Sequence, residues 1–549
     1  MYLFKKNIYL IILTFVFLLA FFLRFYNLGV NPPSLDWDEA SIGYNAYSIL
    51  KTGADEYGNK LPLSIRSFGD YKPPAYIYLS VPSIALFGLS EMGVRLPSAI
   101  LGFLSVITIY FLTKEIFSKL EKNKKEILAI LAAFFWGVSP WSLQFSRAAF
   151  EGNAGIFFFL LAFLLLLKSL KAKWLAILAA ISFVLSIYSY HSFVLITPLF
   201  IAAFTLLFWK DILVNKKYYL VSLLFGLIIS LPVYSSFISI GGSGSRLSMV
   251  SIFATGETIN PSIKRLEYDY SRSDKIGAIL DNRRVVYFLA LAKGYFDHWN
   301  PDFLFFNGDG GGQHHAVNMG MQYLWELPFI IFGIYFIFRD RTKKSLLILV
   351  LFLIAPLSSA VSTGTPHPVR AIAMAPAFSI FTALGVYYFF LNRNNYKYKI
   401  LLVITAGLFV INFAYYLHQY YVHTPRQISH WWQYGNKEAV LEAKSVENKY
   451  SKILFTYIYD QPYIYYLFHN KIEPSWYQKN WNYQGSGQVE RMRRVIGKYE
   501  FRKINYSQDS QLKNTLLIGS PNEIPENAPG LIKTIYFLDG SVAFRIVGT

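Results

Sequence analysis

A long apolar run, IYLIILTFVFLLAFFLRFYNL at residues 8–28, is followed closely by the acidic stretch Asp36-Trp37-Asp38-Glu39. A run of about 20 mainly apolar residues is long enough to cross a lipid bilayer as a helix. Two lysines precede it and no small-residue cleavage site follows it, so we expect a retained membrane helix and not a cleaved signal peptide. The three carboxylates then lie at the lipid–water boundary, where a charge is costly to hold and is usually functional.

The composition is that of a membrane protein. Hydrophobic residues make up 54% of the 549 residues and charged residues only 15%, and the apolar residues gather into runs too long for soluble helices. The net charge of +19 lies largely in short loops between these runs, so we interpret it as a topology signal and not as a nucleic-acid-binding surface. The chain has no cysteine, which excludes disulfides and thiol chemistry.

Eleven segments have the apolarity expected of membrane helices. If the N-terminus is inside, the basic loops 168–173, 210–217, 339–344 and 393–399 all fall on the inner side, as the positive-inside rule requires. The chain then ends outside. The predicted spans are about 8–28, 94–113, 127–143, 154–168, 174–190, 193–209, 219–238, 322–338, 345–362, 371–391 and 400–417.

One shorter apolar stretch, residues 74–89, does not fit this series. It has about 16 residues, fewer than the ~20 that a bilayer needs. If it crossed, the next span would leave the basic loop 114–125 outside, against the positive-inside rule. We therefore predict that it lies along the membrane surface.

The predicted topology divides the chain into two domains. Residues 1–417 form a transmembrane domain with a first external loop at 29–93 and a long external loop at 239–321. Residues 418–549 contain short runs of β-branched and aromatic residues, such as 453–458, between helical stretches. We expect a small extracytoplasmic α/β domain there.

The unusual polar residues of the chain fall on the predicted outer side. A carboxylate can accept a proton from a hydroxyl, while a lysine or arginine can hold a phosphate at the bilayer edge. A fixed cation beside a departing phosphate stabilises the charge that the phosphate gains. The set therefore suits a reaction in which a lipid-borne phosphate loses a group to an external hydroxyl. Its members are Asp36, Asp38, Glu39, Lys72, Arg147, Glu151, His191, His314, His367 and Arg370.

These residues also have structural interpretations. Lys72 and Arg95 could be side chains that extend along the membrane interface to keep their charges in water. Arg147 and Glu151, four residues apart, could form an ion pair at a helix end. His191 could be a hydrogen-bonded interfacial residue. The gathering of the whole set on one side favours a functional site.

Three motifs near the N-terminus resemble those of the C-type glycosyltransferases that use a polyprenyl-phosphate sugar. They are Asp38-Glu39, Lys72-Pro73-Pro74 and Arg95-Leu96-Pro97, in this order and with these gaps. The sequence is most similar to the lipid A aminoarabinose transferases and the bacterial protein O-mannosyltransferases. The resemblance is strongest over residues 20–160, continues more loosely to about 390 and does not extend to the C-terminal domain.

The resemblance implies roles for single residues. By this similarity Asp38 is the catalytic base beside Glu39, and Lys72 and Arg370 face the lipid-linked phosphate. Glu151, with Arg147 four residues before it, matches an acidic residue of the second external loop, where the aminoarabinose transferases have Asp instead. The resemblance thus makes Glu39 and Glu151 further catalytic candidates and Arg147 a further phosphate ligand. The remaining candidates for substrate binding are Asp36, His191, His314 and His367.

The resulting prediction is a helical multi-pass membrane enzyme with the C-type glycosyltransferase fold. It would move a sugar, with inversion, from a polyprenyl-phosphate donor to a hydroxyl of lipid A, a protein or a cell-surface glycan. The resemblance places it in the inner or plasma membrane with the site facing the periplasm or exterior. It implies no metal in catalysis, although the sequence does not exclude a divalent ion, and membrane lipids but no nucleic acid as partners.

The alternative is a transporter or flippase of lipid-linked sugars. Such a protein would carry polar groups near the middle of the bilayer and on both faces of the membrane. Here the predicted inner loops hold little beyond Lys and Arg, while the acidic residues and histidines lie on the outer side. The charge pattern therefore favours the enzyme.

Overall fold

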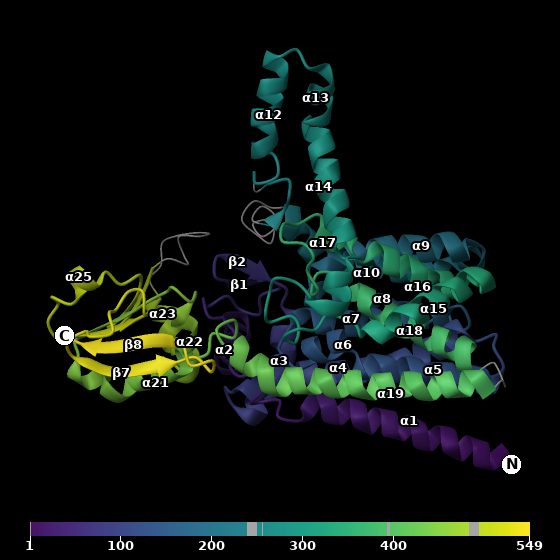
Figure 1. Ribbon diagram of the computed structural model, residues 1–549, viewed down its shortest axis with the longest axis horizontal. Helices are drawn as coiled ribbons and strands as arrows, with labels where there is room; N and C mark the ends of the chain where they lie inside the picture. Colours follow the sequence, from purple (N-terminus) through teal and green to yellow (C-terminus); the bar gives the residue numbers. More distant parts are fainter. Residues whose placement is uncertain (1, 239–249, 255, 392–395, 482–492) are drawn as a thin grey trace.

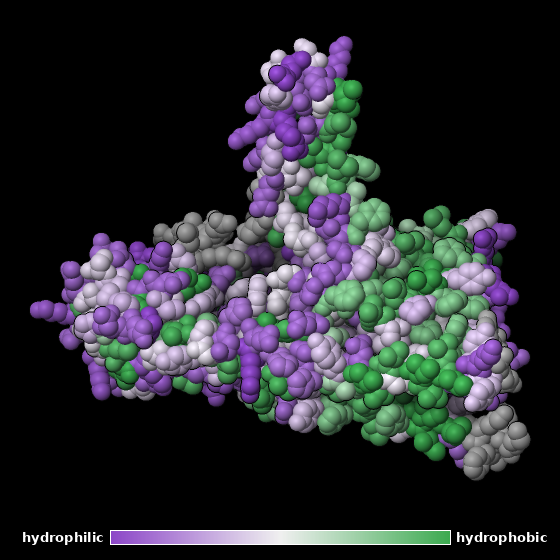
Figure 2. All heavy atoms as spheres, in the orientation of Figure 1, coloured by the Kyte–Doolittle hydropathy of each residue, from purple (hydrophilic) through white to green (hydrophobic). Residues whose placement is uncertain are grey.

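The computed structural model describes residues 2–238, 250–254, 256–391, 396–481 and 493–549. It is a bundle of long helices with a small sheet domain at one end (Figure 1). Within the described residues, eight helices are long and apolar enough to cross a membrane, and a bent pair raises the number to nine. Apolar side chains predominate on the visible surface of the bundle, with polar side chains at its two ends, while the sheet domain is mainly polar (Figure 2). The protein is therefore a multi-pass membrane protein.

All eleven segments predicted as spans are helical, although the number of true spans stays a prediction. Three of the helices are not among the eight long ones: α8 and α15, with 15 and 14 residues, and α5, which continues into α6 (Pro140–Ser146) after a bend of 57°. Helices α16 and α18 have 12 residues each and reach the length of a span only together with the short helices beside them, as residues 343–360 and 372–390. The eleven helices are α1 (Tyr2–Phe25), α4 (Glu91–Ile116), α5 (Lys122–Val138), α7 (Glu151–Ser169), α8 (Leu175–Ser189), α9 (Ser192–Val214), α10 (Lys216–Ile238), α15 (Leu327–Asp340), α16 (Lys343–Ile354), α18 (Ala375–Val386) and α19 (Tyr396–His418).

The first predicted loop is folded. It contains α2 (Trp37–Thr52), the hairpin β1 (Ile65–Ser67) and β2 (Asp70–Lys72), and α3 (Ala75–Phe87). The predicted surface stretch 74–89 is thus a helix of 13 residues, too short to cross a bilayer. We call the end of the bundle that carries this loop and the sheet domain the loop end.

The long loop predicted at 239–321 also contains helices, apart from residues 239–249 and 255, which lie outside the described residues. Helices α12 (Asn260–Ser271), α13 (Lys275–Leu280) and α14 (Arg283–Asp297) form an arm that projects sideways from the bundle (Figure 1). The arm leaves near the loop end and runs across the direction of the membrane helices.

The C-terminal region folds as the predicted mixture of helices and strands. Its six strands have the order β4-β5-β3-β6-β8-β7, with β3 parallel to both of its neighbours and the other pairs antiparallel. The strands are β3 (Lys452–Phe455), β4 (Arg494–Ile496), β5 (Tyr499–Phe501), β6 (Thr515–Gly519), β7 (Leu531–Tyr536) and β8 (Val542–Gly548); the helices include α21 (Asn436–Val446), α22 (Pro462–His469) and α23 (Pro474–Asn480).

The sheet domain and the first loop share one hydrophobic core. Ile42 and Tyr44 of α2 lie in the same buried cluster as Phe468 of α22 and Val94 of α4. Gly43 allows this close approach, because a Cβ at that position would lie 2.5 Å from the Phe468 ring. Helix α2, which carries Asp38 and Glu39, is therefore packed between the membrane bundle and the C-terminal domain.

Arg95 of α4 ties the first loop to the bundle. Its guanidinium is fully buried and donates to both carboxylate oxygens of Glu39, at 2.9 and 2.8 Å. It also donates to the backbone carbonyls of Leu28, Pro32 and Ser34. The interpretation of Arg95 as an interfacial side chain with its charge in water is therefore wrong.

We predict that breaking this pair destabilises the protein strongly. Arg95→Met or Glu39→Gln leaves a buried polar partner uncompensated, which typically costs about 3–5 kcal/mol, while the double change Arg95→Met/Glu39→Met should recover much of the loss. Thermal unfolding of the detergent-solubilised protein measures this. Lys437→Met is the control, because Lys437 pairs with Glu91 at a more exposed site, where a pair is worth about 0–1 kcal/mol. If Arg95→Met and Glu39→Gln each destabilised the protein as little as Lys437→Met does, the buried pair would not be the constraint described here.

Candidate active site

Helix α2 begins at the acidic stretch that the sequence singled out. Asp36 caps the helix, and its carboxylate accepts a hydrogen bond of 2.7 Å from the backbone N–H of Glu39. The side chain is buried, and burial, followed by the neighbouring charges of Glu39 and Asp38, raises its pKa well above the ordinary range. This geometry favours a structural role for Asp36 in place of the predicted substrate contact.

Three charged side chains meet beside this helix. The Nζ atom of Lys72 lies 2.5 Å from Oδ1 of Asp38 and 3.9 Å from Oε1 of Glu151. The Lys72 side chain is only 6% exposed, whereas that of Asp38 is 48% exposed. A buried cation therefore joins two carboxylates, one of which faces solvent. The structure thus brings together three of the predicted site residues that lie far apart in the sequence.

The charge of Lys72 is maintained by its surroundings. Burial alone would lower the pKa of Lys72, but the carboxylates of Asp38 and Glu151 and the hydrogen bond to Asp38 outweigh burial and raise it. Lys72 is therefore cationic at neutral pH. Because it is buried, it does not keep its charge in water at the membrane interface, and that interpretation is wrong for Lys72 as well.

The hairpin that carries Lys72 is held from two sides. Phe68 and Gly69 both have positive φ, as a tight two-residue hairpin turn requires. The hydroxyls of Ser41 and Ser67 are 2.9 Å apart, which links α2 to the hairpin. His191, at the start of α9, lies with Nε2 3.3 Å from the carbonyl oxygen of Tyr71. The predicted site residue His191 therefore contacts the backbone next to Lys72.

Histidines from two later segments pack beside Glu151. The ring of His314 lies against Phe150, the residue before Glu151, with ring centroids 5.8 Å apart, and against the ring of His367 at 4.9 Å. Nδ1 of His314 lies 2.7 Å from Oδ2 of Asp309. The predicted candidates His314 and His367 thus join the same region.

Arg370 lies next to this group. Its Nη1 donates to the Ser362 hydroxyl at 2.6 Å and to the Thr363 carbonyl at 2.8 Å. The preceding residue, Val369, packs on Gly152, where a Cβ would lie 2.8 Å from a Val369 methyl. The start of α7, which carries Glu151, and the Arg370 segment are therefore neighbours.

Glu39 and Arg147 make contacts that differ from those expected for their predicted roles. The carboxylate of Glu39 is held by Arg95 and by the backbone N–H of Ala149, at 2.8 Å. Arg147 is also buried, and it donates to the Tyr420 hydroxyl and to the carbonyls of Leu23 and Asn31. These contacts favour structural roles in place of a catalytic Glu39 and a phosphate-binding Arg147.

Sequence reasoning missed three residues that shape the region. Asp309 orients His314, and its position in a Gly-rich stretch was the only signal. The ring of Trp432 lies under Arg95 and against Phe150. Gln433 accepts a hydrogen bond of 3.2 Å from the backbone N–H of Trp37. Trp432 and Gln433 follow the last membrane helix, and no motif links them to the first loop.

The resemblance implied no metal in catalysis, although the sequence did not exclude a divalent ion. Within the part of the chain that the structure describes, no group of three or more His, Cys, Asp or Glu side chains could hold a metal ion.

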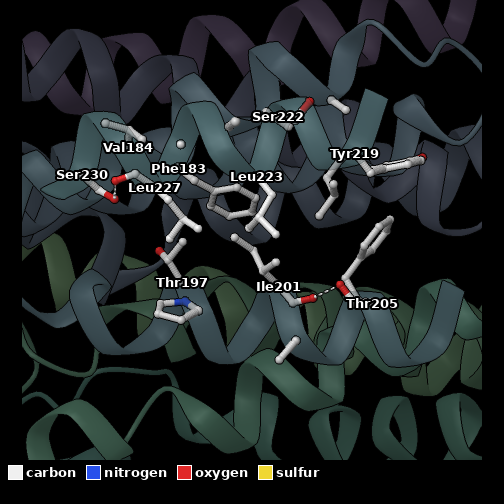
Figure 3. A pocket seen from close by; sticks show the side chains of 18 of the residues that line it. Phe183, Val184, Thr197, Ile201, Thr205, Tyr219, Ser222, Leu223, Leu227 and Ser230 are labelled. Carbon is white, nitrogen blue, oxygen red and sulfur yellow. Dashed lines mark hydrogen bonds between the residues drawn. The ribbon is translucent and has the colours of Figure 1, made fainter. Parts of the chain in front are cut away.

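A cavity of about 520 Å³ lies between α8, α9 and α10 (Figure 3). Phe183, Ile201 and Leu223 face it, and its lining is almost wholly apolar. Thr197, at one end, lies less than two helical turns after His191 on α9. The cavity therefore runs through the membrane part of the bundle and starts near the hairpin that carries Lys72.

The raised pKa of Asp36 predicts a pH-dependent effect of Asp36→Asn. Asn caps helices as well as Asp, so the cap survives. In the wild type, protonation of Asp36 stabilises the folded state. This stabilisation is complete below about pH 4, which is the pKa of an Asp in the unfolded chain, and it is lost as the pH rises through the higher pKa of Asp36 in the folded protein. The variant lacks this loss, so its stability relative to the wild type should increase from pH 4 to pH 8. Thermal unfolding at several pH values measures the difference, and a constant difference would contradict the burial of this carboxylate.

Comparison with known proteins agrees with the motifs. Residues 71–235, which include Lys72 and Glu151, match the family of dolichyl-phosphate-mannose-protein mannosyltransferases. A curated relative, "Putative mannosyltransferase YkcB" of Bacillus subtilis (strain 168), is 27% identical over 180 residues. This match covers 32% of the chain and only 23% of the length of YkcB.

Two solved proteins have a similar fold. ArnT from Cupriavidus metallidurans in the apo state gives a TM-score of 0.52 at 13% identity, over 99% of this chain and 98% of ArnT. ArnT bound to undecaprenyl phosphate gives 0.52 at 12% identity, over 98% and 97%. AglB from Archaeoglobus fulgidus, in complex with an inhibitory peptide and a dolichol-phosphate, gives 0.51 at 14% identity, over 85% of this chain and 64% of AglB. The chain therefore shares its fold with ArnT and with AglB, and this is the kind of fold that its first-loop motifs predicted.

Proposed function

We propose that the protein is an inverting glycosyltransferase that moves a sugar from a polyprenyl-phosphate donor to an acceptor hydroxyl. The observation that carries this proposal is the position of Lys72, a buried cation between Asp38 and Glu151 at the loop end of the bundle. It lies in the segment that matches the mannosyltransferase family. Two proteins with the same fold, ArnT and AglB, have been solved with a polyprenyl phosphate.

The residues suit a single displacement. The acceptor oxygen attacks the anomeric carbon while its proton moves to Asp38, and the bond from that carbon to the phosphate oxygen breaks on the opposite side. Polyprenyl phosphate leaves with the bonding electrons. Lys72 and Arg370, which comes from the segment that packs on the start of α7, would stabilise the negative charge that the phosphate gains. Protonated Asp38 then returns its proton to water, which its exposure permits.

In the structure the ammonium group of Lys72 is paired with the carboxylate of Asp38. A carboxylate paired with a cation is a weaker base than an unpaired one. A donor phosphate that takes over Lys72 would release Asp38 from this pair and increase its basicity. Glu151, on the other side of Lys72, would keep the ammonium group in place during the exchange.

The apolar cavity between α8, α9 and α10 offers a place for the isoprenoid chain of the donor. It begins near the Lys72 hairpin and is lined by hydrocarbon side chains along the membrane part of the bundle. A lipid chain there would leave its phosphate at the loop end. The rival function, transport of lipid-linked sugars, requires polar groups within the membrane, whereas the polar residues gathered here lie at one end.

The acceptor would approach from the side of the C-terminal domain. Gln433, near the start of that domain, accepts a hydrogen bond from the backbone N–H of Trp37, next to Asp38. Tyr465 of α22 donates to the carbonyl of Leu35 at 3.2 Å. The domain therefore borders the exposed face of Asp38, and we propose that it selects among lipid, glycan and protein acceptors.

The reaction can be tested in proteoliposomes with a radiolabelled polyprenyl-phosphate sugar. Asp38→Asn keeps the size of the side chain but removes the base, and should lower transfer ~10²–10⁴-fold while donor binding persists. Lys72→Ala and Arg370→Ala each remove a charge-assisted contact worth roughly 1.5–3 kcal/mol, so each should lower transfer about 10- to 100-fold. Lys60→Ala, an exposed lysine of the same loop, is the control and should transfer normally. Normal transfer by Asp38→Asn would contradict its role as the base.

We further propose that the loop end faces the periplasm or the cell exterior. The chain has no native cysteine, so single cysteines report their own position. Lys60→Cys, in the first loop, should react with an impermeant thiol reagent in intact cells, and Asn123→Cys, at the opposite end of the bundle, should react only after permeabilisation. Both positions are exposed in the structure, so burial does not confuse the result. The reverse pattern would place the loop end inside the cell.

A further inference from the structure

The arm formed by α12, α13 and α14 exposes large apolar side chains. On α14 the positions Val285, Phe288, Leu289, Ala292 and Phe296 follow helical spacing and form one stripe. Phe288 is 68% exposed and Phe296 66%. Such a stripe is costly in water unless another surface covers it.

The neighbouring helices continue this pattern. On α13, Ile276, Ile279 and Leu280 are all strongly exposed, and they share a face at spacings of three and four residues. Helix α12 packs against α13, and Arg265 of α12 pairs with Asp281 at 2.6 Å. One side of the arm is therefore apolar and the other side carries the charged residues of α12.

The apolar side faces the direction of the membrane. The arm runs across the membrane helices, so it extends in the plane of the bilayer (Figure 1). The apolar atoms of the arm lie on the side where α13 and α14 run, which is the side toward the apolar bundle surface, and the polar atoms lie on the α12 side (Figure 2). The apolar surface of the bundle thus continues, past the edge of the protein, along the underside of the arm.

The base of the arm is firmly attached. Ser251 and Ser362 form an isolated antiparallel bridge on one side of the base. On the other side, Asp297 accepts a hydrogen bond of 2.6 Å from the Thr365 hydroxyl. Tyr295 donates to the carbonyl of Leu353 on α16 at 3.0 Å. The arm is therefore anchored on the turn that also holds Arg370, and not on a free linker.

We infer that the arm is an amphipathic lipid-surface anchor that lies on the bilayer at the loop end, with its α13 and α14 apolar face in the interface. Amphipathic helices of this kind bury their apolar face below the phosphates and place basic side chains at the level of the head groups. The arm provides such side chains at its tip and along α14: Arg272, Lys275, Arg283 and Arg284. Residues 260–297 carry seven basic and five acidic side chains, so the net positive charge of the arm favours anionic lipid as the partner.

The base of the arm is connected to the site through Arg370. A membrane-bound arm would fix the height of Ser362 and Thr363 relative to the lipid phosphates. Both residues hold the guanidinium of Arg370. The arm would thus set the level at which Arg370 meets the membrane surface. The lipid contact itself does not depend on the proposed transfer reaction.

The lipid contact can be measured on the full-length protein in nanodiscs that contain phosphatidylglycerol. Spin labels are attached at Phe288→Cys, Ile279→Cys and, as the matched control on the polar helix, Glu267→Cys. The first two side chains are 68% and 65% exposed, so their removal costs no packing. The measurement is the accessibility of each label to oxygen, which enters lipid, and to a water-soluble nickel chelate.

The inference predicts that the labels at positions 288 and 279 are reached by oxygen but not by nickel, at a depth of roughly 5–10 Å below the phosphates, while the label at 267 is reached by nickel. Nickel access at all three positions would overturn it. Exclusion of both reagents at 288 and 279 would also overturn it, because it would show that protein, such as a second copy of the chain, covers the apolar face.

Discussion

The buried ion pair between Arg95 and Glu39 is the constraint on which the site depends. Arg95 comes from the first turns of a membrane helix, and Glu39 from the first turn of α2. A guanidinium without water must find all its partners within the protein, and here it finds them in one carboxylate and three backbone carbonyls of the preceding segment. The pair therefore fixes where α2 begins. It also sets the direction in which Asp38, one residue earlier, projects.

Two adjacent acidic residues in the first turn of α2 have different roles. Glu39 points inward and is used by Arg95 and the N–H of Ala149, whereas Asp38 points to Lys72 and to solvent. Consecutive residues on a helix differ by about 100° in direction, which explains why adjacent carboxylates have such different surroundings. Asp36, two residues earlier, caps the helix. The acidic stretch thus supplies a cap, a base and a structural anion.

Much of this arrangement could be predicted from the sequence, and the exceptions have a common cause. The apolar runs identified all the bundle helices, and charge bias placed Asp38, Lys72 and Glu151 at one end, where they meet. The contacts of Arg95 and Arg147 were not predicted, because both donate to backbone carbonyls of residues 23–34, and Arg147 also donates to the Tyr420 hydroxyl. The structural role of Glu39 was not predicted either, because it depends on the buried Arg95 and on the backbone N–H of Ala149. A pattern of side chains does not reveal contacts to the backbone.

The arm and the C-terminal domain illustrate a second limit. The loop 239–321 has no run long enough to cross a membrane, and short amphipathic helices within it were not predicted. The strands of the C-terminal domain were recognisable by their β-branched and aromatic residues, but their packing on α2 was not. Contacts such as Gly43 against Phe468 join residues more than four hundred positions apart. Only the folded chain shows that this domain borders the site.

In the proposed mechanism Lys72 leaves Asp38 to bind the phosphate of a lipid donor. Electron cryomicroscopy of the full-length protein in nanodiscs with a polyprenyl phosphate tests it most directly. We expect phosphate density within hydrogen-bonding distance of Lys72 Nζ, with Arg370 on the same group and a longer separation between Lys72 and Asp38 than the 2.5 Å seen here. Phosphate bound elsewhere, with the contact between Lys72 and Asp38 unchanged, would contradict it.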